Sequence, residues 1–150
     1  MNNKKHGNIP ATAVAKYELA LLQALLEIKY IPVSRFVMSS SRTDSVRFTA
    51  LEHVYLESKS DSMEMVKILS ARLGEMERRK LVVIDYDTPL PGYSYKTHRD
   101  SDVFRYFDDT VKEGSKRPGF LCDTAEIEYG RVAISPLGLI IARKFTTPRG

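Results

Sequence analysis

Residue types that can do chemistry are few in this chain, and their spacing matches no catalytic or metal-binding motif. The histidines and the cysteine lie far apart, at His6, His53, His98 and Cys122. A zinc site needs such residues at short paired spacings, and a cysteine nucleophile needs a partner base. No phosphate-binding glycine loop or dinucleotide fingerprint is present either. We therefore expect no enzyme, no metal and no cofactor.

Overall composition is that of an ordinary globular protein. The chain has 150 residues, 43% of them hydrophobic, and a formal net charge of +4. This mild positive charge permits nucleic-acid binding without requiring it. Residues 1–10 form a polar tail that we expect to be disordered, with a DNA-groove arm as the alternative. Residues 11–150 are expected to form a single domain.

Localisation is predicted to be cytoplasmic. The sequence has neither a signal peptide nor an apolar run of about 18 residues, so no membrane association is expected. Its single cysteine, Cys122, cannot form an internal disulfide.

The first half of the chain predicts three helices and a strand. Apolar residues recur at helical spacing over 12–29, 45–57 and 61–79, and a β-branched run predicts a strand over 81–86. Pro32 ends the first helix, and 31–38 is either a short strand or a short helix. Residues 39–44 are a polar loop. Two helices separated by a polar turn at 59–61 follow helix-turn-helix order.

The second half adds an insertion, further strands and a last helix. Prolines and glycines bound an insertion at about 88–119, and helical spacing over 100–113 predicts a helix within it. Short strands are expected at 93–97 and 120–122, and a longer one at 126–134, with a possible bulge at Gly130. Ser135 followed by Pro136 is typical of a helix start, so a C-terminal helix is expected from Pro136.

Two tracts resemble one protein superfamily. The stretch SDSMEMVKILSARLGEMERRKLVVIDYD resembles a recognition helix that leads into the first strand of a wing. The string RVAISPLGLIIARKF resembles the wing-to-helix turn of MarR- and PadR-like transcriptional regulators, with Ser135 and Gly138 at its signature positions. The resemblance implies an α+β winged helix-turn-helix fold. This fold has a three-helix core and a small antiparallel wing sheet, here with an inserted helix in the wing and a C-terminal helix.

The resemblance implies a DNA-binding transcriptional regulator. It would use a recognition helix at about 61–79 and a wing, and it would act as a homodimer through its first and last helices on double-stranded DNA. The candidate DNA-binding residues are Arg42, Arg47, Ser62, Lys67, Ser70, Arg72, Lys96, Arg99, Lys116 and Arg117.

Two alternative functions stay open. One is a winged-helix module for protein–protein interaction or assembly without DNA binding, which the acidic residues Asp61 and Glu64 at the start of the third helix favour. An exposed apolar patch on residues 62–72 would support this alternative, and positive potential there would support DNA. The other is an enzyme whose pocket is lined by Tyr93, Tyr95, Tyr106 and Asp109.

Overall fold

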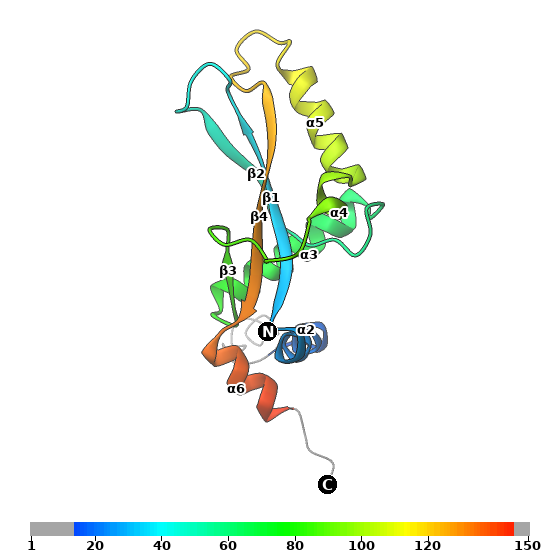
Figure 1. Cartoon of the computed structure of the whole chain (residues 1–150), viewed down its shortest axis with the longest axis vertical. Helices are drawn as coiled ribbons and strands as arrows, with labels where there is room; N and C mark the ends of the chain where they lie inside the picture. The colour runs from blue at the N-terminus through cyan, green and yellow to red at the C-terminus, as the bar shows by residue number, and fades with distance from the viewer. Residues whose placement is uncertain (1–13, 146–150) are drawn as a thin grey trace, which may run out of the picture.

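A four-stranded antiparallel sheet is the centre of the molecule. The computed structural model describes residues 14–145. The strands are β1 (Tyr30–Ser39), β2 (Arg47–Val54), β3 (Val82–Asp85) and β4 (Thr124–Ile134), in the order β2-β1-β4-β3. Strands β1 and β4 are the longest and pair along their whole length, from Tyr30–Ala133 to Ser39–Thr124. Figure 1 shows them as the long axis of the molecule.

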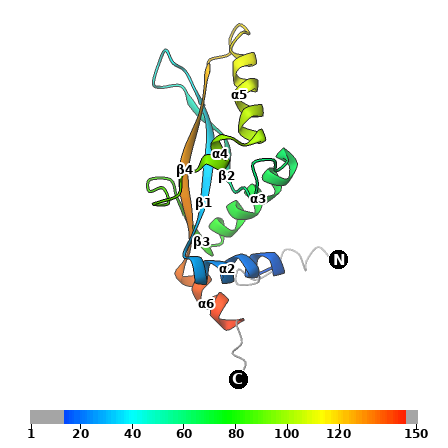
Figure 2. The same cartoon turned by 45° about the vertical axis from the view of Figure 1, so that its right-hand side comes forward.

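Helices lie at one end of the sheet and along one of its faces. They are α2 (Lys16–Ile28), α3 (Met63–Arg78), α4 (Lys96–Arg99), α5 (Asp102–Gly114) and α6 (Pro136–Lys144). Helices α2 and α6 pack together at the base, whereas α5 runs beside the upper part of β1 and β4 (Figures 1 and 2). We call the opposite end, made of the loops 40–46 and 115–123, the tip.

Two hydrophobic clusters lie on opposite faces of the sheet, because successive side chains of a strand alternate. Val33 belongs to a cluster with residues of α2, β3, α6 and the C-terminal half of α3. Phe36, which points the other way, packs with Val103 of α5 and with Val66 in the N-terminal half of α3. Helix α3 therefore contributes to both clusters.

Strand β2 carries two irregularities in its pairing with β1. The pairs Met38–Phe48, Phe36–Leu51 and Ser34–Val54 lie on one face, although their β2 members are three positions apart instead of the usual two. Extra residues in β2 account for this spacing, as in β-bulges. One irregularity contains Ala50, and the other contains His53, whose φ of 53° is left-handed. Both bend β2 relative to β1.

The predicted winged helix-turn-helix fold is wrong. Strands dominate the core, and a curled half-barrel sheet replaces the three-helix core. The predicted helix over 45–57 is strand β2, and the segment 31–38 is strand β1. The expected strand at 93–97 instead leads into the short helix α4, and Gly130 pairs in register with Val33 without a bulge between β1 and β4.

Several local predictions are confirmed. The helix predicted over 61–79 is α3, with Ser62 as its N-cap, and the inserted helix is α5. At the last helix, the Ser135 hydroxyl accepts a hydrogen bond from the Gly138 amide at 2.9 Å, as a helix N-cap does. The predicted tail at 1–10 lies outside the described residues. No helix within residues 14–145 is long and apolar enough to cross a membrane.

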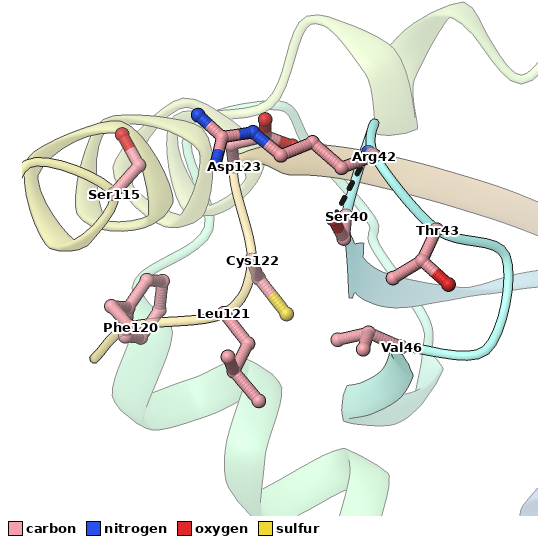
Figure 3. A pocket seen from close by; sticks show the side chains of 9 residues that line it. All are labelled: Ser40, Arg42, Thr43, Val46, Ser115, Phe120, Leu121, Cys122 and Asp123. Atoms are coloured by element: carbon pink, nitrogen blue, oxygen red, sulfur yellow. Dashed lines mark hydrogen bonds between the residues drawn. The ribbon is translucent and has the colours of Figure 1, made fainter. Parts of the chain in front are cut away.

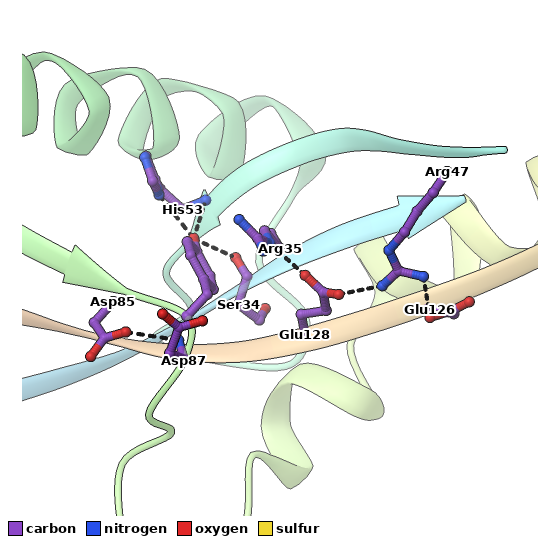
Figure 4. A network of polar contacts seen from close by, with 9 residues as sticks. Ser34, Arg35, Arg47, His53, Asp85, Asp87, Glu126 and Glu128 are labelled. Atoms are coloured by element: carbon purple, nitrogen blue, oxygen red, sulfur yellow. Dashed lines mark hydrogen bonds and ion pairs between the residues drawn. The ribbon is translucent and has the colours of Figure 1, made fainter. Parts of the chain in front are cut away.

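The upper sheet face opposite α5 carries a charged network (Figure 4). Arg35 donates to Glu128 at 2.6 Å, and Arg47 bridges Glu126, at 2.9 Å, and Glu128. The Ser39 hydroxyl, followed by Arg47, lowers the pKa of Glu126. Since the arginines of β2 and β1 face the two glutamates of β4 in equal number, the network keeps this face polar without leaving a net charge.

Candidate interaction surface

The candidate DNA-binding residues do not form one surface. Arg47 lies on the sheet face opposite α5, whereas Lys96 and Arg99 belong to α4 and Lys116 and Arg117 follow α5. Ser62 caps α3, and Lys67, Ser70 and Arg72 lie on it. Arg42 lies in the β1–β2 loop. The loop with Arg42 and the segment with Lys116 and Arg117 meet at the tip (Figure 1), where Arg42 and Arg117 line adjoining hollows.

Most of these side chains already have partners within the chain. Arg47, Lys96 and Lys116 form ion pairs with Glu126, Asp100 and Glu113 respectively. Ser62 caps α3, Ser70 donates to the Glu52 carbonyl at 2.5 Å, and Arg72 stacks on Tyr17. Arg99 donates to the Ser94 carbonyl and the Tyr129 hydroxyl. The three ion pairs, those of Arg47, Lys96 and Lys116, reduce the positive charge that a DNA phosphate would meet.

The outer face of α3 is partly apolar. Met65 and Ile68 are 49% and 45% exposed, at a spacing that places them on one side of the helix. Exposed Lys67 and Arg72 share this helix with exposed Glu64 and Glu75. The face is thus mixed in charge and carries two exposed apolar side chains.

A longer apolar groove runs between α5 and β2, and we call it the α5 groove. It consists of two adjoining hollows of about 610 and 160 Å³ that share Ala50, Tyr106, Phe107 and Thr110. Met38 and Phe36 form part of its floor, and Met63 of α3 lies at its lower end. Tyr106, on its rim, is 65% exposed.

The groove exists because α5 covers only part of the sheet. Helix α5 packs on β4 and β1 through Val103, Phe104, Phe107 and Val111, and it leaves the same face of β2 open. Phe48, which pairs with Met38 on that face, is 50% exposed, and Ala50 is exposed as well. Strand β2 is also the edge of the sheet, so nothing within residues 14–145 pairs with its outer side.

A third hollow of about 480 Å³ continues the groove at the tip (Figure 3). It shares Phe120 with the α5 groove and lies between the β1–β2 loop and the segment that follows α5. Cys122 lines it but is buried, and burial followed by the charge of Asp123 raises the pKa of the thiol. A raised thiol pKa lowers the thiolate fraction, so Cys122 is a poor nucleophile there.

Other chemistry-bearing residues serve structural roles. Tyr95, one of the residues considered for an enzyme pocket, is 2% exposed and stacks on Tyr129, so it lines no open site with Tyr106. His53 is held by the Tyr86 hydroxyl at 2.8 Å and by Glu77 at 3.1 Å. Within residues 14–145, no group of three or more histidine, cysteine or carboxylate side chains is placed to hold a metal ion.

The α5 groove was not predicted from the sequence. Its floor residues Ala50 and Leu51 were assigned to a helix, which hid the open strand they belong to. One available signal was the alternation of Arg47 and Thr49 with Phe48 and Ala50. No protein-family model, curated protein or solved structure matches the chain.

Proposed function

We propose that this chain is a protein-interaction module that binds an amphipathic helix of another protein in the α5 groove. The observation that carries the proposal is the continuous apolar groove beside α5, open to solvent and bordered by exposed Phe48 and Tyr106. Contiguous exposed apolar surface of this kind marks interaction sites in soluble proteins. The alternative function expected from the sequence, an interaction module, is retained without the winged-helix fold.

The dimensions of the groove favour a helix as its occupant. Neighbouring strands lie about 4.8 Å apart and a helix is about 10 Å wide, so α5 covers about two strands. A second helix over β2 would rest on that strand and extend past the free edge of the sheet, where it meets no other element of residues 14–145. The open part of β2, residues 47–51, spans about 17 Å, which a helix of about 11 residues would match. Met63 of α3 limits the groove at its lower end.

Charges on the rim define the polar side of the partner helix. Asp109 and Glu113 of α5 line the larger hollow together with Arg117, and Lys67 of α3 lines the smaller hollow, so the acidic part of the rim is the part formed by α5. Glu113 has one ion pair, with Lys116 at 3.6 Å, and both of these side chains are largely exposed. We therefore expect the partner helix to place lysine or arginine beside α5 and apolar residues over β2.

The test uses peptides of about 12 residues selected from a random library on the folded protein. The variant Ala50→Arg places a long charged side chain in the groove, and Thr49→Arg places the same side chain on the opposite sheet face as a control. We expect selected helical peptides to lose about tenfold or more in affinity, by fluorescence anisotropy, for Ala50→Arg and to retain it for Thr49→Arg. Equal binding to both variants, or no enrichment, would reject the groove as the site.

DNA binding is the second candidate function, and the grouping of cations at the tip favours it. Arg42 and Arg117 make no ion pair within residues 14–145, although the Asp123 carboxylate lies near Arg42 (Figure 3), and Lys116 directly precedes Arg117. Such a protein would bind DNA through the tip, as a homodimer through α2 and α6, which pack together and expose Ile28 and Ile140.

A gel shift with random duplexes at low salt tests this candidate. We expect the double charge reversal Arg42→Glu and Arg117→Glu to weaken any binding and to lower the slope of log affinity against log salt by about two. Light scattering of the same samples reports the dimer. The absence of any shift by the unmodified chain at low salt would exclude this function.

A further inference from the structure

A separate pocket lies between α2 and α3, away from the α5 groove. Its volume is about 310 Å³, at the lower end of the range for small-molecule sites. Residues of both helices, of β1 and of the segment after β2 line it; they are Tyr17, Ala20, Leu21, Ile31, Tyr55, Glu57, Leu69, Arg72, Leu73 and Met76. The α5 groove shares none of these residues.

The floor of this pocket is apolar and fixed by the core. Ile31, Leu73 and Met76 are buried members of the hydrophobic cluster on this sheet face, and Leu21 and Tyr55 pack against that cluster. Apolar walls that are already ordered in the folded protein bind an apolar ligand with little loss of conformational entropy. The floor therefore selects a hydrocarbon or aromatic body.

The rim offers one cation that is free of carboxylate partners. Arg72 stacks over the Tyr17 ring, with its guanidinium carbon 4.1 Å from the ring centroid, and it forms no ion pair within residues 14–145. The neighbouring acid, Glu18, is instead held by Arg79 at 2.8 Å, so it does not neutralise Arg72. A guanidinium fixed on an aromatic ring can bind a carboxylate through two parallel hydrogen bonds, that is, in a bidentate manner.

The second charged residue of the rim restricts the ligand further. Glu57 also lines the pocket, and its carboxylate would repel a second negative charge on the ligand. The nearby Tyr55 hydroxyl has a raised pKa, chiefly through burial and then through Glu57, so it stays neutral and able to donate a hydrogen bond. Together these groups admit one negative charge, at the Arg72 side.

We propose that the pocket between α2 and α3 binds a monocarboxylate with an apolar body, such as a medium-chain fatty acid. The carboxylate pairs with Arg72, and the hydrocarbon lies on the floor formed by Ile31, Leu73 and Met76. This binding site is independent of the α5 groove and of its partner helix.

Titration calorimetry with decanoate and decanol, each below its aggregation limit, tests the proposal on the full chain. Decanoate is expected to bind the unmodified chain more tightly than decanol, and Arg72→Gln is expected to weaken decanoate about tenfold with little effect on decanol. Arg78→Gln is the matched control, since Arg78 lies on the same helix but pairs with Glu75 in solvent. Ala20→Phe, at an exposed position of the pocket wall, should weaken both ligands.

Three results would overturn the proposal. They are the absence of decanoate binding to the folded chain, equal affinity for decanoate and decanol, and an equal loss of decanoate affinity in Arg72→Gln and Arg78→Gln. Circular dichroism of each variant confirms folding before titration. Peptide binding to the α5 groove is measured on different variants, Ala50→Arg and Thr49→Arg. A negative result for one site therefore leaves the proposal for the other site standing.

Discussion

Replacing Gly138 by alanine is expected to destabilise the protein by about 3 kcal/mol or to prevent folding. A Cβ atom at this position would lie 2.1 Å from the carbonyl oxygen of Leu81, which is far inside van der Waals contact. That carbonyl is itself fixed, because it accepts a hydrogen bond from the Ser135 amide at 3.1 Å. The first turn of α6 must therefore move away from the chain that enters β3.

The matched control is Gly74→Ala in α3. A Cβ atom there would lie 3.6 Å from the Arg78 side chain and 3.7 Å from His53, which are ordinary contacts. Because alanine favours helix over glycine, Gly74→Ala should stabilise the protein by about 0.5–1 kcal/mol. Urea unfolding at neutral pH measures both variants. A Gly138→Ala variant as stable as the unmodified chain would show that α6 and Leu81 are not packed in this way.

Acidification is expected to remove about 3 kcal/mol of stability through one residue, His98. Its side chain is fully buried between Ser34 and the Tyr93 and Tyr95 rings, with the Ser34 hydroxyl 2.7 Å from Nδ1. Its Nε2 meets no hydrogen-bond partner within residues 14–145. Burial lowers the pKa of His98 from 6.5 to about 4, since a charged ring would lose its hydration.

The sign of the pH dependence follows from this lowered pKa. The unfolded chain takes up a proton near pH 6.5, whereas the folded chain resists doing so until about pH 4. The contribution of His98 to stability is thus complete above pH 6.5 and is lost as the pH falls to about 4. The groups around the ring are neutral, so no nearby carboxylate offsets the effect.

Urea unfolding of the unmodified chain and of His98→Gln between pH 7 and pH 4.5 measures this contribution. Glutamine keeps a polar group beside Ser34 but does not titrate. Stability of the unmodified chain should fall by about 1.4 kcal/mol per pH unit more steeply than that of His98→Gln over the lower part of this range. Parallel curves would mean that His98 is already accessible to protons in the folded state.

The sequence predicted helices better than it predicted the sheet, and strand β2 shows why. Phe48, Leu51 and Val54 recur every three residues, and this spacing of apolar residues, taken by itself, indicates a helix. In the structure these residues lie on one face of a strand, because two bulges each add a residue to the two-residue period. Bulges depend on the neighbouring strand, so the local pattern could not reveal them.

Capping chemistry was predictable because it is local. Ser62, Ser101 and Ser135 each accept a hydrogen bond from the amide three residues later, and the helices begin where these serines are found. The α5 groove and the pocket between α2 and α3 depend instead on how α5 and α3 lie against the sheet. Apart from the alternation over residues 47–50, residue types carried no signal for either cavity. Of the cations chosen as DNA contacts, Arg47, Lys96 and Lys116 proved to form ion pairs within the chain.

Burial of β1 on both faces has a consequence for misfolding. A slip of one residue in β1 would exchange Val33 with Ser34, placing a hydroxyl in the apolar cluster and a valine against the buried His98 ring. Either change is costly, so β1 can pair with β4 in one register only. The central pairing is therefore fixed, whereas the edge strand β2 is open and partly apolar, so any strand exchange between copies would begin at β2.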